Sequence, residues 1–87
     1  EDRRAEQKKR REIEKLTKRQ EQLEAEITQR EKSLKELSEA ITHAGQAQQT
    51  DEVRRLGEEY AAGEAALQKR WDEWTGIGEQ LERVGKD

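Results

Sequence analysis

Residues 13–44 read IEKLTKRQEQLEAEITQREKSLKELSEAITHA, and this stretch decides the fold. Counted in sevens, it repeats apolar residues at the first and fourth places, the a and d positions of a heptad. The a positions hold Ile13, Gln20, Ile27, Leu34 and Ile41, and the d positions hold Leu16, Leu23, Arg30, Leu37 and Ala44. Only Gln20 and Arg30 interrupt the pattern. The repeat predicts a helix that buries a narrow apolar stripe against a partner helix.

A second heptad run supplies that partner. Its a positions hold Val53, Tyr60, Leu67, Trp74 and Leu81, and its d positions hold Leu56, Gly63, Arg70, Ile77 and Val84. In an antiparallel pair, a positions of one helix face d positions of the other, so the numbers of facing residues have a constant sum. A sum of 97 pairs every layer, from Ala44 with Val53 to Ile13 with Val84. We therefore predict an all-α, two-helix antiparallel coiled-coil hairpin that is monomeric.

The heptads also place the elements of this hairpin. The predicted elements are a basic N-terminal lead or helix extension at 1–12 and a hairpin domain at 13–87, made of a helix at 13–44, a turn at 45–50 and a helix at 51–84. Gly45 is expected to end the first helix in the left-handed conformation, and Thr50 is expected to cap the second. At roughly 1.5 Å per residue, the rod should be about 50 Å long.

Three residues at the predicted interface are not typical of a coiled-coil core. Gly63 is expected to face Leu34 and to leave it room. Arg30 and Arg70 are expected to turn outward toward acidic neighbours. The acidic candidates are Glu26, Glu31 and Glu73.

The composition bounds the class of protein. Charged residues make up 45% of the chain and hydrophobic ones 29%, with no Cys, Pro, Phe or Met. This is too little apolar material for a globular core, although it suits a two-helix interface. Disorder is the alternative for such a composition, and the uninterrupted heptads argue against it. We expect no membrane span or signal peptide. Because the chain does not begin with Met, we expect it to be part of a longer protein.

The residues also lack the motifs of catalysis. There is no glycine-rich phosphate loop and no Ser or Cys nucleophile beside a base. A two-helix rod offers no pocket that could desolvate paired carboxylates. His43 is the single histidine, and we interpret it as a polar residue near the turn rather than a metal ligand. We expect a non-enzymatic chain with no metal, cofactor or small-molecule substrate of its own.

A basic segment precedes and overlaps the first heptads. Arg4, Lys8, Arg11, Lys15 and Lys18 recur at spacings of three and four, and we call these five residues the basic stripe. Together with their neighbours they are candidate phosphate ligands. The full candidate set is Arg3, Arg4, Lys8, Lys9, Arg10, Arg11, Lys15, Lys18 and Arg19. A solvated charged helix start is the alternative. Trp71 and Trp74 are interpreted as packing residues rather than base-stacking platforms.

Several segments resemble the C-terminal coiled-coil domain of ABC-F ATPases, of the Uup-like group. Glu12-Ile13-Glu14-Lys15-Leu16 and Leu23-Glu24-Ala25-Glu26-Ile27 match the first helix of that domain, and Arg70-Trp71 matches an Arg-Trp-x-x-Leu motif of the second. Trp74 stands where the family has leucine. The tip at 45–50 lacks the Asp-Pro and the aromatic residue that are frequent in the family.

The resemblance implies an accessory domain that follows two ATP-binding cassettes in a cytoplasmic protein. Such proteins act on ribosomes, and the domain is associated with binding to nucleic acid, including DNA. We therefore expect this hairpin to bind DNA or ribosomal RNA in a sequence-tolerant, salt-dependent way. Two alternatives stay open: a structural spacer or protein-docking module without nucleic-acid affinity, and a hairpin arm of an RNA-handling enzyme such as a synthetase.

Overall fold

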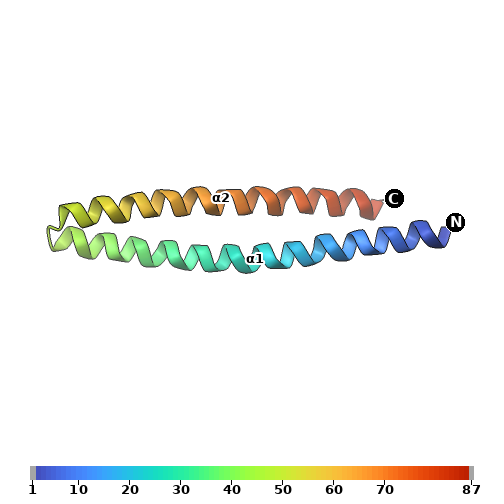
Figure 1. The fold of residues 1–87 in the computed structure, drawn as a ribbon, viewed down its shortest axis with the longest axis horizontal. Coiled ribbons are helices and arrows are strands. Elements are labelled where there is room, and N and C mark those ends of the chain that lie inside the picture. The colour runs from blue at the N-terminus through green and yellow to red at the C-terminus, as the bar shows by residue number, and fades with distance from the viewer. Residues whose placement is uncertain (1, 87) are drawn as a thin grey trace.

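The structure is a helical hairpin. The computed structural model describes residues 2–86, and side chains for 2–85, as two helices. Helix α1 spans Asp2–Gln46 and helix α2 spans Thr50–Lys86. They lie side by side in opposite directions, with the N- and C-terminal ends at one end of the rod and the turn at the other (Figure 1). The predicted all-α hairpin is confirmed.

Both helices are longer than the predicted ranges. Helix α1 begins at Asp2, so the basic residues that precede Ile13 form a helical extension. This segment is rich in Ala, Glu, Gln, Lys and Arg, which are good helix formers. The molecule measures 69 × 15 × 14 Å, against the expected length of about 50 Å. The difference arises because α1 runs past the end of α2 (Figure 1).

The turn between the helices corrects the prediction for Gly45. No described glycine has a positive φ, and α1 continues through Gly45 to Gln46. Gln48 adopts the left-handed conformation instead, with a φ of 59°. The Gln49 N–H donates to the Ala44 carbonyl (2.9 Å), and the Gln48 N–H donates to the Gly45 carbonyl (3.1 Å). These two bonds are those of a Schellman motif, with Gln48 in the place usually taken by glycine.

The start of α2 also differs from the prediction. The carbonyl of Gln49 accepts a hydrogen bond from the Val53 N–H (3.0 Å). Since the N-cap carbonyl is the first acceptor in a helix, Gln49 holds that position and Thr50 is the first helical residue. Asp51 and Glu52 follow in the first turn, where negative charge interacts favourably with the helix dipole.

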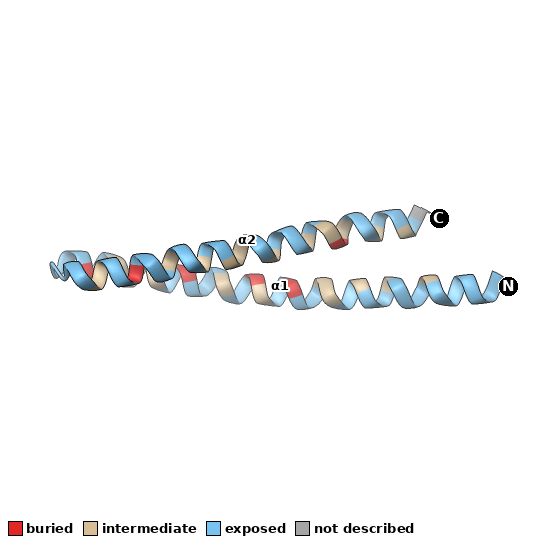
Figure 2. Ribbon diagram, turned by 45° about the horizontal axis from the view of Figure 1, so that its top comes forward, coloured by how far each residue is buried: buried red, intermediate tan, exposed pale blue. Residues whose placement is uncertain are grey.

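The core is a single row of apolar residues between the helices. Its buried members all occupy predicted a or d positions, and they are Leu23, Ile27, Leu34, Ala44, Leu56 and Ile77. The other apolar a and d residues are half-buried, because one partner helix covers only one side of the stripe. Figure 2 shows the buried residues on the facing sides of α1 and α2. Within the described residues, neither helix has a stretch long and apolar enough to cross a membrane.

The contact between Leu34 and Gly63 confirms the predicted register. A methyl carbon built on Gly63 would lie 2.8 Å from Cδ2 of Leu34, so the two residues face each other and glycine leaves room for the leucine.

The two arginines at d positions behave differently. Arg70 turns outward as predicted, and its Nε lies 3.5 Å from Oε1 of Glu26. Arg30 is half-buried and forms no ion pair with any residue among 2–85. The prediction for Arg30, an outward turn toward an acidic partner, is therefore not matched by an ion pair among these residues.

Candidate nucleic-acid interface

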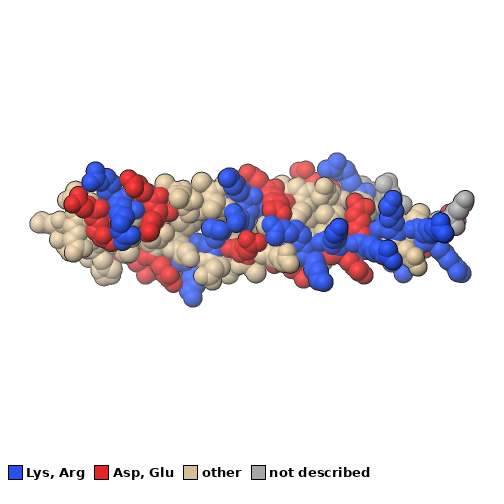
Figure 3. Space-filling view, viewed as in Figure 1, with Lys and Arg blue, Asp and Glu red and all other residues tan. Residues whose placement is uncertain are grey.

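The basic stripe lies on the side of α1 that faces away from α2. Its five side chains are all exposed and occupy heptad positions opposite the a and d residues. They form no ion pair with any residue among 2–85. Figure 3 shows Lys and Arg gathered over the N-terminal part of α1, with fewer acidic residues between them. The structure therefore leaves the positive charge of the stripe open to solvent.

The stripe follows one nearly straight line along a continuous helix. From Arg4 to Lys18 it spans about 21 Å at 1.5 Å per residue. A shallow surface depression runs beside its second half, lined by Arg11, Lys15, Lys18 and their neighbours on α1. Glu14 and Glu21 also line this depression, so the positive surface is edged by carboxylates there.

The remaining candidates differ in how accessible they are. Arg3 and Arg10 are exposed and extend the positive surface around α1. Lys9 is half-buried at a d position. Arg19 is half-buried and points toward α2, away from the line of the stripe. The structure thus places Arg3, Arg10 and the stripe on a common solvent-facing surface and separates Arg19 from them.

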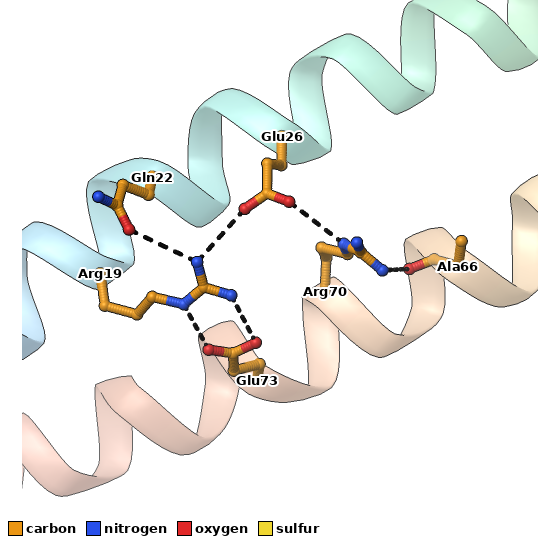
Figure 4. Close-up of polar contacts among 6 residues, drawn as sticks. All are labelled: Arg19, Gln22, Glu26, Ala66, Arg70 and Glu73. Atoms are coloured by element: carbon orange, nitrogen blue, oxygen red, sulfur yellow. Dashed lines mark hydrogen bonds and ion pairs between the residues drawn. The ribbon is translucent and has the colours of Figure 1, made fainter.

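Arg19 is the centre of an ion-pair cluster between the helices, which we call the Arg19 cluster (Figure 4). It holds the Glu73 carboxylate with two hydrogen bonds, Nε to Oε2 at 2.6 Å and Nη2 to Oε1 at 2.9 Å. Its Nη1 lies 3.4 Å from Oε2 of Glu26, which also pairs with Arg70. Arg70 donates a further bond to the Ala66 carbonyl (3.4 Å). The cluster therefore links α1 to α2 through alternating charges.

The cluster shifts the protonation of its members. Hydrogen bonds from Arg19 hold the pKa of the Glu73 carboxyl below its ordinary value, and the nearby charges of Arg19 and Arg70 act in the same direction. The same hydrogen bonds raise the pKa of Arg19. Both groups are therefore charged at neutral pH. Because its charge is already matched by Glu73 and Glu26, Arg19 is better suited to joining the helices than to holding phosphate.

Heptad position is the signal that could have found this role. Arg19 immediately precedes the a residue Gln20, at a g position that flanks the interface. Glu73 holds the corresponding g position before Trp74. In an antiparallel coiled coil, g positions of the two helices lie on the same side of the interface, so oppositely charged residues there pair across it. Charge density alone groups Arg19 with the stripe, whereas its heptad position places it beside the interface.

The two tryptophans contact each other beside the interface. Their ring centroids are 5.5 Å apart and their planes meet at 83°, an edge-to-face arrangement. The Nε1–H of Trp74 donates a hydrogen bond to Oε2 of Glu24 on α1 (3.1 Å). Trp74 thus packs between the helices as predicted, whereas Trp71 is partly exposed.

The histidine and the acidic side chains are the potential metal ligands of this chain. Among them, no group of three or more His, Cys, Asp or Glu side chains could hold a metal ion. His43 is exposed in the last turn of α1. Comparison of the chain with protein-family models, with curated proteins and with solved structures gave no match.

Proposed function

We propose that this hairpin is a non-catalytic accessory domain that binds DNA or ribosomal RNA through the basic stripe. The observation that carries the proposal is the exposure of five aligned cations without ion-pair partners among residues 2–85. Like charges at these spacings cost an isolated helix roughly 0.2–0.5 kcal/mol per pair. Helix stability therefore does not account for the stripe, whereas a phosphate backbone would relieve the repulsion.

The geometry suits contact with phosphates rather than with bases. Each strand of a duplex carries one phosphate per 3.4 Å or so of helix axis, so a line of about 21 Å along that axis spans several of them. Each Lys of the stripe can pair with a phosphate as a point charge, and each Arg can donate two parallel hydrogen bonds to one. The stripe consists of Arg and Lys alone, and these side chains can contact phosphates regardless of the base sequence. The binding should therefore tolerate any sequence.

Salt dependence provides the test. Neutralising up to five phosphates gives a slope of at most about −4.5 in a plot of log association constant against log salt for a duplex. Replacing all five stripe residues with Gln should lower the affinity and flatten the slope, leaving only the contribution of neighbours such as Arg3 and Arg10. Fluorescence anisotropy with labelled duplex DNA and duplex RNA, over a series of salt concentrations, measures both quantities.

The chain offers a matched control for this experiment. Five exposed cations lie elsewhere, again two Arg and three Lys, namely Lys32, Lys35, Arg54, Lys69 and Arg83. Replacing them with Gln removes five positive charges as well, so that each variant changes the net charge from −3 to −8. We expect the control variant to keep most of the affinity and slope. An equal loss in both variants, or an unchanged stripe variant, would contradict the proposal.

The spacer alternative makes a different prediction for the same titration. A structural spacer or docking rod has no affinity for DNA or RNA even at low salt. Failure of the unmodified chain to bind either duplex would therefore favour that function.

We further propose that the hairpin belongs to a cytoplasmic ABC-F ATPase and that ATP is bound by other parts of that protein. The support is the match of residues 12–16, 23–27 and Arg70-Trp71 to the C-terminal domain of that family. The sequence encoded upstream of Glu1 tests this proposal. Two ATP-binding cassettes there would support it, and a different domain would reject it without bearing on nucleic-acid binding.

A further inference from the structure

A pocket between the helices is lined by the two tryptophans and by carboxylates. We call it the tryptophan pocket, and its lining residues are Glu24, Ile27, Thr28, Glu31, Trp71 and Trp74. Its floor is apolar because Ile27 is a buried core residue. Trp71 is 37% exposed, and it is the one large hydrophobic side chain among the described residues that is exposed rather than covered. This combination of an open indole and nearby carboxylates is not required by coiled-coil packing.

The chemistry of the pocket matches a cation. Indole faces attract cations through the ring quadrupole, and both ionisable residues that line the pocket are carboxylates. The Trp74 Nε1–H already binds one oxygen of Glu24, which leaves the other carboxylate oxygen to accept a second donor. The same carboxylates would repel a phosphate backbone. A nucleic-acid base stacked on Trp71 would bring such a backbone with it, so the pocket is poorly suited to nucleic acid.

The size of the pocket further limits which cations could bind in it. Its volume is ≈ 250 Å³, below the roughly 300–1,000 Å³ of typical small-molecule sites. One long side chain would fill it. A guanidinium is planar, stacks on aromatic rings and donates paired hydrogen bonds to carboxylates, whereas an ammonium is a compact and strongly hydrated point charge. These properties favour arginine over lysine.

We propose that the tryptophan pocket binds an arginine side chain on a basic segment of a partner protein. The inference is independent of the basic stripe, because the lining residues belong to neither the stripe nor its neighbours. The hairpin would then carry two contact surfaces, the basic stripe for anions and the tryptophan pocket for cations.

NMR of the two indole N–H groups tests the proposal directly, because Trp71 and Trp74 are the only tryptophans. The probes are a capped tetra-arginine peptide, a capped tetra-lysine peptide and a capped tetra-citrulline peptide, which keeps the shape of arginine without its charge. We expect saturable shifts of the indole signals with tetra-arginine, weaker binding of tetra-lysine and no effect of tetra-citrulline. Equal binding of the lysine or citrulline peptide would overturn the proposal.

Variants of the pocket supply the second arm. Trp71→Ala should weaken tetra-arginine binding by about two- to fivefold, the range expected for an exposed cation–π contact. Glu31→Gln leaves the packing intact and should also weaken it, while Glu64→Gln, an equal charge change at an exposed site outside the pocket, should not. A loss with Glu64→Gln as large as with Glu31→Gln would show nonspecific attraction and reject the site.

Two further outcomes would assign the pocket to another occupant. If a second copy of the chain covered the pocket, sedimentation equilibrium would show a dimer for the unmodified chain and a monomer for Trp71→Ala. Duplex DNA or RNA would shift the indole signals if nucleic acid entered it. Either result would overturn the assignment to arginine.

Discussion

Replacing Gly63 with alanine should be less favourable than the same replacement at Gly57, because only Gly63 faces a core side chain. A methyl carbon at Gly63 would lie 2.8 Å from Cδ2 of Leu34, whereas one at Gly57 meets nothing within 4 Å. Both glycines lie inside α2, so both replacements gain about 1 kcal/mol of helix propensity. The difference between the two variants therefore isolates the contact with Leu34.

The expected magnitudes follow from packing. Forcing an extra carbon into a filled core costs about 1–3 kcal/mol. Gly63→Ala should thus change the free energy of unfolding by between about 0 and −2 kcal/mol, while Gly57→Ala should raise it by about 1 kcal/mol. When Leu34 is first replaced with alanine, its Cδ2 methyl, which would contact the added methyl at residue 63, is absent. Gly63→Ala should then stabilise the hairpin by about 1 kcal/mol, so the cycle gives a coupling of about 1–3 kcal/mol.

Urea unfolding followed by far-UV circular dichroism measures all of these variants. The denaturant dependence of each should match the parent, since a changed slope would indicate a different unfolded or folded state. If Gly63→Ala stabilised the parent chain as much as Gly57→Ala does, the added methyl would meet no resistance from Leu34. That result would refute the tight packing of Leu34 against Gly63.

Two other perturbations test the turn and the Arg19 cluster. Gln48→Gly should raise the free energy of unfolding by about 0.5–1 kcal/mol, because glycine adopts the left-handed conformation without strain. Gln46→Gly, within α1, should lower the free energy of unfolding by about as much. Thermal denaturation of both variants checks that the two effects have opposite signs. Glu73→Gln should lower the melting temperature at neutral pH, because the native pKa of Glu73 is depressed by Arg19. That stabilisation is present above the ordinary carboxyl pKa and is lost as the pH falls through the depressed value, so the gap to the parent should close in acid. Glu64→Gln, at an exposed site without a described ion pair, should show no such gap.

The candidate site could be predicted from the sequence only in part. The spacing of three and four that aligns the stripe is a property of any helix, so the exposed line of Arg4, Lys8 and Arg11 follows once α1 forms. Arg19 could not be assigned by charge alone. Its g position places it beside α2, but whether it forms an ion pair there depends on the residue that α2 brings beside it, which is Glu73.

The heptads by themselves determined the class of fold and the pairing of the helices. A helix that buries only its a and d positions must put them against a partner, and two runs on one short chain close with a constant sum in one register. The contact of Leu34 with Gly63 follows from that arithmetic.

Only the tertiary structure decided the details that depend on side chains meeting across the helices and on the path of the turn. Gln48, rather than Gly45, takes the left-handed conformation, because the end of α1 is set by where the chain must reverse to pair with α2. The tryptophan pocket likewise needs residues of both helices, Glu24 and Glu31 from α1 and Trp71 from α2. Heptad periodicity specifies which residues are buried between two helices, but the groups that flank the interface acquire their chemistry only when the helices pack.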